Sequence, residues 1–111
     1  METLSGLRVM IMNNIPSYED LKQIKSYKTY DIFFPIIGGY FRLTINEDGV
    51  NNIALDYIEG GYLRYINHNF NSNYHFSKLY KFNKKNYEGL LKLYKKMLKV
   101  MYEDIEKELK K

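Results

Sequence analysis

The 111-residue sequence contains no cysteine, only two histidines and no long run of apolar residues. Without cysteine the chain has no disulfide, no thiolate metal site and no cysteine nucleophile. The histidines, His68 and His75, stand seven residues apart, and no carboxylate is placed to complete a metal-ligand set with them. No stretch of about 18 apolar residues is present, so we expect no membrane-spanning segment. These absences predict a chain that holds neither a metal nor another cofactor.

The motifs of common enzyme classes are also missing. No glycine-rich loop precedes a helix to hold phosphates, and neither a serine-centred turn nor a metal-ligand spacing is found. We therefore expect a protein that is not an enzyme. The lack of cysteine and of a clear signal peptide is typical of an intracellular, cytoplasmic protein.

Residue types that A+T-rich codons specify are abundant. Asn, Ile, Lys, Phe and Tyr account for 54 of the 111 residues, and lysine outnumbers arginine 14 to 3. Such a composition is common in bacteria of low G+C content, in some archaea, and in their viruses and plasmids. A virus or mobile element is thus a plausible source, in which case we expect the protein to bind a host protein in the host cytoplasm. The same bias can explain much of the tyrosine and lysine content.

The length indicates one α+β domain over residues 1–111, in which residues 1–14 are either disordered or an extra strand. Ser17 is a candidate helix N-cap, with Asp20 three residues later as in a capping box. Apolar residues at helical spacing predict a first helix from Tyr18 to Tyr27. We expect this short helix to cover one part of a sheet.

Residues 29–67 alternate between apolar and polar side chains and contain three glycine-bearing turns, the pattern of four antiparallel strands. At the first turn, a two-residue Gly38-Gly39 loop pairs Ile37 with Tyr40. Because side chains alternate between the two faces of a sheet, this register gathers the apolar residues of both strands on one face.

At the second turn, Glu47–Gly49 forms a three-residue loop in which Gly49 occupies a G1 bulge. This loop aligns Leu43 with Ile53 and keeps the apolar residues on one face. Pro35 has no backbone N–H, so we expect its strand at an edge of the sheet. The predicted inner face carries Ile32, Phe34, Ile36, Phe41, Leu43, Ile45, Ile53, Leu55, Tyr57, Leu63 and Tyr65.

At the third turn, a loop over Glu59–Gly61 pairs Tyr57 with Leu63, because a shorter loop would mix the two faces. The same register pairs Asp56 with Arg64, which we interpret as a structural cross-strand ion pair. The predicted outer face carries Phe33, Pro35, Tyr40, Arg42, Thr44, Asn52, Ala54, Asp56, Tyr62, Arg64 and Ile66.

Two further elements follow the meander. Tyr74–Phe82 alternates again and predicts a fifth strand, and Lys84–Lys111 predicts a long helix that packs on the inner face. The apolar seam of this helix comprises Tyr87, Leu91, Tyr94, Leu98, Met101 and Ile105, flanked by Leu90, Met97 and Leu109. The predicted fold is α+β: a short N-terminal helix, an antiparallel meander of four to five strands, and a long C-terminal helix packed on one face of the sheet.

The long helix has more apolar surface and more length than one sheet needs. Leu93 and Val100 lie about 100° round the helix from the centre of the seam. About 25 helical residues span roughly 38 Å, whereas five strands give a sheet only about 20 to 24 Å across. We therefore expect a homodimer or another protein partner, bound through this helix or through the edge strand with Pro35. The predicted protein interface comprises Leu93, Val100, Tyr40, Tyr62 and Arg64.

Nucleic-acid binding is the alternative function. Residues 78–111 hold 11 of the 17 cationic residues and 5 of the 13 acids, a net charge of +6. Tyrosine and arginine side chains on the sheet could stack bases, while lysines of the helix hold the phosphates. Asp56 argues against this use of the sheet, and a solvated outer helix face is the commoner explanation of the lysines. The predicted nucleic-acid site comprises Lys92, Lys95, Lys96, Lys99 and Arg42.

Overall fold

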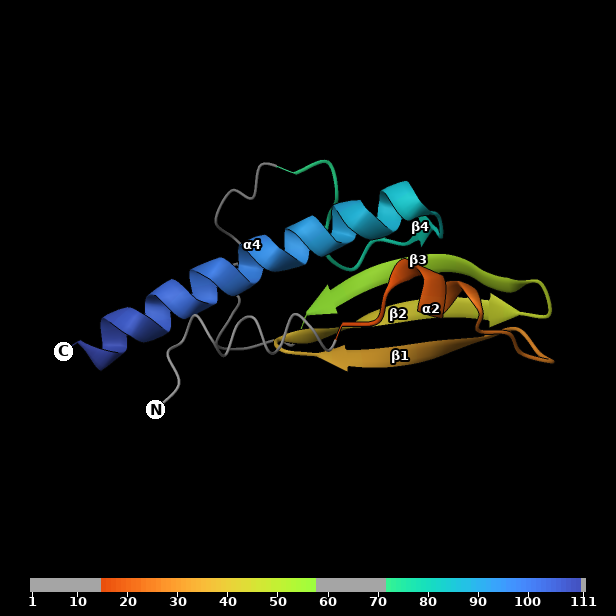
Figure 1. Cartoon of the computed structure of the whole chain (residues 1–111), viewed down its shortest axis with the longest axis horizontal. Coiled ribbons are helices and arrows are strands. Elements are labelled where there is room, and N and C mark those ends of the chain that lie inside the picture. The colour runs from red at the N-terminus through yellow and green to blue at the C-terminus, as the bar shows by residue number, and fades with distance from the viewer. Residues whose placement is uncertain (1–14, 58–71, 111) are drawn as a thin grey trace.

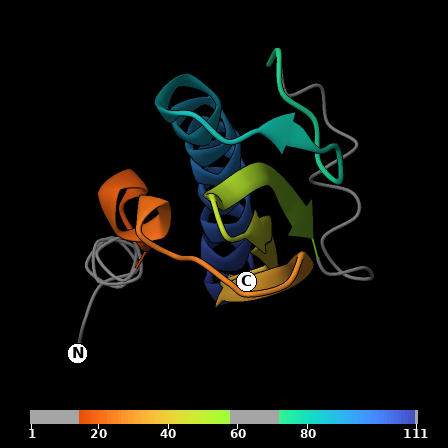
Figure 2. The ribbon, with the colours of Figure 1, turned by 90° about the vertical axis from the view of Figure 1, so that its right-hand side faces the viewer.

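The computed structural model of the protein describes residues 15–57 and 72–110 (Figure 1). Its elements, in chain order, are helix α2 (Tyr18–Lys22), strands β1 (Tyr30–Ile36), β2 (Gly39–Asn46), β3 (Gly49–Tyr57) and β4 (Tyr80–Lys81), and helix α4 (Lys84–Leu109). The four strands form one antiparallel sheet in the order β1-β2-β3-β4. Helix α4 packs against one face of this sheet, and α2 lies beside α4 (Figure 2). The predicted α+β architecture is confirmed.

The hydrophobic core lies between α4 and the inner face of the sheet. Alternate residues of β2 and β3 enter it, because successive strand side chains point to opposite faces. Each of these residues is at most 1% exposed: Phe41, Leu43, Ile45, Ile53 and Leu55. Helix α4 contributes Tyr87, Leu90, Leu93, Tyr94, Met97, Leu98, Met101 and Tyr102, and α2 contributes Leu21. The inner-face residues of β1 are only half-buried, because β1 is an edge strand.

The turn between β1 and β2 is the two-residue loop Ile37-Gly38, and Ile36 pairs with Gly39. The predicted register of these two strands is therefore wrong by two residues. A shift of two leaves every side chain on its own face, so alternation alone does not detect it. Gly38 supplies the positive φ of the turn, 83°. Gly39 has a separate role, because a Cβ there would lie 2.1 Å from the carbonyl oxygen of Asp56 in β3.

The register between β2 and β3 is confirmed, since Leu43 lies opposite Ile53. Gly49 has a φ of 111°, as its predicted place in a bulged turn requires. It also pairs in the ladder, so the loop is one residue shorter than predicted. The bulge itself is a register shift between Thr44 and Ile45.

The second neighbour of β3 is β4, which comes from the predicted fifth strand. Ile53 pairs with Tyr80, and the Ser77 N–H donates to the Leu55 carbonyl at 2.8 Å. Only two residues of the predicted strand are extended in the sheet, because Ser77 turns the chain with a φ of 62°. The strand and turn predicted to follow β3 fall within residues 58–71, outside the described residues.

Helix α2 begins as predicted and ends early. Ser17 is its N-cap, and the Ser17 Oγ accepts a hydrogen bond of 3.1 Å from the backbone N–H three residues on. The helix ends at Lys22, because the following residues turn toward the sheet and the Ser26 N–H donates to the Asn46 carbonyl. Tyr27, the predicted last residue of this helix, lies beyond its end and is 96% exposed, so the predicted C-terminal boundary is wrong.

Helix α4 starts at the N-cap Asn83, whose Oδ1 accepts a hydrogen bond from the Asn86 N–H at 2.8 Å. Its 26 residues correspond to about 39 Å, and its C-terminal part extends past the ends of β2 and β3, as predicted (Figure 1). Leu109 is 72% exposed, which corrects its predicted place beside the seam. The predicted seam position of the Ile105 side chain lies outside the described side chains. Neither helix of the described residues has the length and apolar content to cross a membrane.

Candidate functional site

The outer face of the sheet carries a small ionic network centred on Arg42. The Arg42 Nε donates to Asp56 Oδ2 at 3.0 Å, and its Nη1 lies 3.9 Å from Asp31 Oδ2. The other oxygen of Asp31 accepts from the Thr44 hydroxyl at 2.8 Å. The negative charges of Asp31 and Asp56 thus offset the positive charge of the Arg42 guanidinium, so Arg42 would attract a phosphate only weakly. This geometry removes Arg42 from the predicted nucleic-acid site.

On the outer face of the sheet, two residues of β3 are buried and not exposed to solvent. Ala54 and Asp56 are 0% and 7% exposed, so this part of the sheet is not an open platform for bases. Asp56 forms a cross-strand ion pair with Arg42, and its predicted pair with Arg64 stays a prediction. Tyr62 and Arg64, which were predicted for an interface on this face, lie outside the described residues.

Tyr40 is half-buried and shares its surface with Phe33. The two rings meet edge to face with centroids 5.4 Å apart, an arrangement that stabilises aromatic pairs. Phe33 itself is 56% exposed. Tyr40 therefore supports an exposed aromatic residue on the neighbouring strand, and its predicted interface role stays a prediction.

Most of the exposed large apolar side chains of the described residues belong to β1 or to the residues just before and after it. Six such side chains are exposed, and four of them belong to residues 27–37. We call these four the β1 strip: Tyr27, Tyr30, Phe33 and Ile37. Tyr30 and Phe33 point to opposite faces of the sheet, because they are three residues apart in one strand. The β1 strip therefore surrounds the edge of the sheet and does not form a patch on one face.

The apolar surplus predicted on α4 is largely covered within the chain. Leu93 is 2% exposed and belongs to the core, which removes it from the predicted interface. Val100 is half-buried and packs against the same core. The sequence places both residues correctly on the flank of the seam but does not show that the fold covers this flank.

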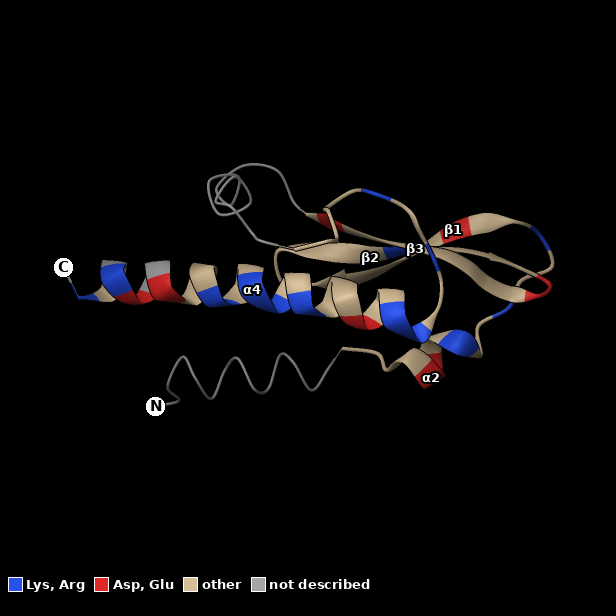
Figure 3. Cartoon of the chain, turned by 90° about the horizontal axis from the view of Figure 1, so that it is seen from above, with Lys and Arg blue, Asp and Glu red and all other residues tan. Residues whose placement is uncertain are grey.

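The lysines of α4 are exposed, but they do not all line the same groove. Lys92 and Lys96 line a groove on one side of the helix, whereas Lys95 lines a separate hollow beside α2. Lys99 is exposed and lines neither. Figure 3 shows the basic residues along the first two thirds of α4, with most of its acids near the C-terminal end.

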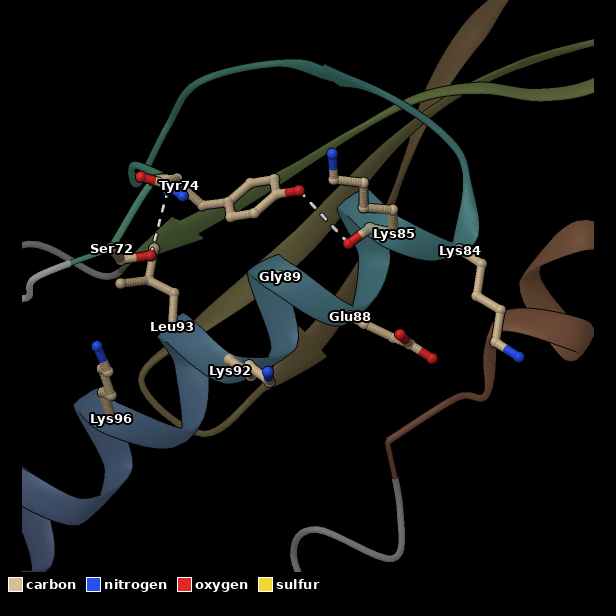
Figure 4. A pocket seen from close by; sticks show the side chains of 10 residues that line it. Ser72, Tyr74, Lys84, Lys85, Glu88, Gly89, Lys92, Leu93 and Lys96 are labelled. Carbon is tan, nitrogen blue, oxygen red and sulfur yellow. Dashed lines mark hydrogen bonds between the residues drawn. The ribbon is translucent and has the colours of Figure 1, made fainter.

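The groove has a volume of about 620 Å³ and lies between α4 and residues 72–74 (Figure 4). We call it the lysine groove. Four lysines and one acid line it from the helix, and a tyrosine ring faces them. These residues are Lys84, Lys85, Glu88, Lys92, Lys96 and Tyr74. Lys84 and Lys85 were not predicted as site residues.

Tyr74 is held against α4 by a close contact that only glycine permits. A Cβ on Gly89 would lie 2.0 Å from the Tyr74 ring. The Tyr74 hydroxyl donates to Asn86 Oδ1 at 2.8 Å and lies 3.4 Å from the Lys85 carbonyl oxygen. The Asn86 Nδ2 in turn donates to the Lys81 carbonyl at 2.8 Å. The one signal in the sequence was a glycine inside a helix, where it is unfavourable unless a close approach requires it.

Two buried tyrosines attach α4 to the rest of the fold. Tyr94 packs edge to face on Phe41, and its hydroxyl is buried without a well-formed hydrogen bond within the described residues. Burial raises the pKa of Tyr94 to about 12, and the backbone of Ile37 lowers it only in part. The Tyr87 hydroxyl donates to the Pro16 carbonyl. The pKa of Tyr87 is raised, mainly by burial and to a smaller extent by the negative charge of Asp20.

No group of three or more potential metal-ligating side chains occurs within residues 15–57 and 72–110. His75 is exposed, and His68 lies outside these ranges. Comparison of the chain with protein-family models, with curated proteins and with solved structures gives no match. Any functional proposal therefore rests on the residues and their geometry.

Proposed function

We propose that the protein is a small interaction module without catalytic activity, and that its working surface is the free edge of β1. The observation that carries this proposal is the β1 strip, which holds four of the six exposed large apolar side chains of the described residues. Exposed apolar surface of this kind commonly marks a protein contact.

The arrangement of the β1 strip favours a strand as the partner. A helix or a flat surface would cover only one face of the sheet, whereas Tyr30 and Phe33 point to both. An added strand continues the sheet and lets its own side chains cover both faces. Within the described residues β1 pairs only with β2, so no described strand occupies the side on which we place the added strand.

The backbone of β1 supports the same pairing. Pro35 lies opposite Tyr40 in a continuous ladder, and a proline is tolerated in a strand where its missing N–H would point away from the neighbour. Backbone groups alternate in direction along an antiparallel strand. Asp31 and Phe33 then share the outward direction of Pro35 and offer N–H donors at the free edge.

The partner we propose for this edge is a second copy of the chain. Two β1 strands related by a twofold axis pair antiparallel, so one sequence supplies both halves of the contact. The four residues of the β1 strip carry no charge. The lysine groove lies near β4, at the opposite edge of the sheet, so pairing through β1 does not bring the two grooves together.

The test is the oligomeric state, measured by size-exclusion chromatography with light scattering over a wide range of protein concentration. We expect the average mass to rise from 13.3 kDa toward twice that value as concentration increases. Phe33→Lys should weaken this association about tenfold or more, because it places a charge in the centre of the contact. A mass of 13.3 kDa at every concentration would overturn the proposal.

Ile37 and Leu79 provide a matched pair of variants. Both side chains are 44% exposed, but Ile37 belongs to the β1 strip and Leu79 lies beside β4. Ile37→Lys should reduce association, whereas Leu79→Lys should leave it unchanged. Equal effects of the two variants would show that association depends on general surface hydrophobicity and not on β1.

A further inference from the structure

We propose that the lysine groove binds a linear chain of phosphates, and that the backbone of single-stranded nucleic acid is their source. This inference is independent of the proposed pairing through β1, because it concerns the other edge of the sheet.

Charge is the first argument. The first 19 positions of α4, residues 84–102, contain six lysines and one acid, Glu88. At 3.6 residues per turn these seven residues fall within an arc of about 120°, and all seven are exposed. In a solvated helix face basic and acidic residues usually alternate and support each other. The excess of one sign on one face of α4 is the pattern of a surface that meets an anion.

The pairing of these lysines is the second argument. Of the described residues, none forms an ion pair with Lys84, Lys85 or Lys92, although Glu88 is on the same face of the helix. Arg42 shows the contrast, because two carboxylates already surround it on the sheet. The ammonium groups of Lys84, Lys85 and Lys92 are therefore not engaged in ion pairs with the described residues and can contact an added ligand.

The shape of the lysine groove selects an elongated ligand. Its lysines extend from Lys84 to Lys96, a rise of about 18 Å along the helix. This length accommodates several successive phosphates and exceeds that of a single phosphate group. The wall opposite the helix is held against it, since Tyr74 rests on Gly89 and hydrogen-bonds to Asn86.

The same wall predicts how the ligand is recognised. Tyr74 packs against Gly89 and against the Tyr80 ring, whose centroid lies 5.0 Å from its own. This ring is therefore not a free stacking platform for a base. Lysine binds phosphate as a compact point charge and does not read base edges in the paired geometry that arginine offers. We expect binding that is independent of sequence and strongly dependent on salt.

The primary experiment measures binding of a fluorescent single-stranded oligonucleotide of mixed sequence by anisotropy. Each neutralised phosphate of a single strand contributes about −0.7 to the slope of log K against log salt. Contacts from Lys84, Lys85 and Lys92 then predict a slope of about −2, or roughly 20-fold weaker binding at 200 mM than at 50 mM salt. No binding at the lower salt concentration would overturn the proposal.

Three variants locate the contact on the groove. Lys92→Gln should reduce the slope by about 0.7, and Glu88→Gln should strengthen binding because it removes the one acid of this face. Lys107→Gln is the matched control, an exposed lysine of α4 outside the groove. Circular dichroism and thermal unfolding establish that each variant is folded. Equal effects of Lys92→Gln and Lys107→Gln would show that binding reflects net charge and would overturn the assignment to the groove.

Inorganic polyphosphate provides the second arm, because it has the same phosphate chemistry without bases or sugars. Competition by polyphosphate together with oligonucleotide binding supports phosphate recognition with nucleic acid as the source. Binding of polyphosphate without binding of the oligonucleotide would overturn nucleic acid as the source. Light scattering on the same samples keeps this result separate from self-association through β1.

Discussion

Two regions of the molecule are held in the fold by different interactions. The first is the hairpin sheet, made of β1, β2 and β3, and the second is the β4 segment, residues 72–82. Seven residue pairs join β1 to β2 and eight join β2 to β3, but only two join β3 to β4. The β4 segment is held mainly by side chains, namely Tyr74 on Gly89 and Asn86 on Lys81. The hairpin sheet should therefore unfold as one unit with the core, whereas the β4 segment can open locally.

Gly39→Ala should have the largest effect, because it disrupts the hairpin sheet at a backbone contact. The new Cβ would meet the Asp56 carbonyl oxygen at 2.1 Å, and neither strand can move without loss of pairing. We expect about 3 kcal/mol or more of lost stability in urea unfolding. Gly38→Ala should cost less, because its closest neighbour at 2.9 Å is the flexible tip of Met97 and the strain of alanine at a φ of 83° adds only about 1 to 2 kcal/mol.

Alkaline pH should weaken the contact between the hairpin sheet and α4 through Tyr94. An unfolded tyrosine titrates near pH 10 and folded Tyr94 near 12, so the unfolded chain releases its proton first. The stabilising contribution is present below pH 10 and is lost as the pH rises from about 10 to 12, by at most about 2.7 kcal/mol. Tyr94→Phe should remove this part of the loss, as urea unfolding at pH 9 and 11 would reveal. An unchanged alkaline slope would contradict the assignment to Tyr94.

Asp56→Ala should cost about 2 kcal/mol, because it leaves the partly buried Arg42 without its 3.0 Å partner. Asp31→Ala is the matched change on the other side of the same guanidinium. Its carboxylate is more exposed and 3.9 Å away, so we expect a loss below about 1 kcal/mol. Equal losses in thermal unfolding would show that Arg42 does not depend on Asp56 in particular.

Gly89→Ala should act on the β4 segment and change global stability least. The new Cβ would displace the Tyr74 ring, while alanine improves helix propensity by about 1 kcal/mol. We expect a net loss of about 1 kcal/mol or less and faster hydrogen exchange at the Ser77 and Phe82 amides, which bond to β3. In a Tyr74→Ala background the same substitution should become stabilising. A destabilising effect in that background would show that the glycine has another role.

The sequence predicts those parts of the fold that depend on neighbouring residues, and it does not predict those that depend on contacts with distant parts of the chain. The β2–β3 register follows from one turn and from alternation, and both signals are local. The β1–β2 register was wrong because a shift of two preserves alternation, and the role of Gly39 depends on a carbonyl from β3. Alternation over Tyr74–Phe82 indicated a strand there but not that Ser77 leaves only two residues in the sheet.

The candidate sites were predicted less well than the fold. Exposed lysines on α4 follow from helical spacing, but the groove beside them depends on where Tyr74 packs. Leu93 was assigned to an interface because its own helix gives no sign of the chain that covers it. The β1 strip was anticipated only through Pro35, since exposure at an edge depends on strand order, which a single turn does not determine.

The shortness of β4 limits what an assembly of this protein can become. A sheet that recruits neighbours grows only while it presents a long border at each end. Once two molecules have joined through β1, the outermost of the described strands on both sides are the two-residue β4 strands, which give a third molecule little to align with. Association of this kind would terminate at a closed pair and would not propagate into a filament.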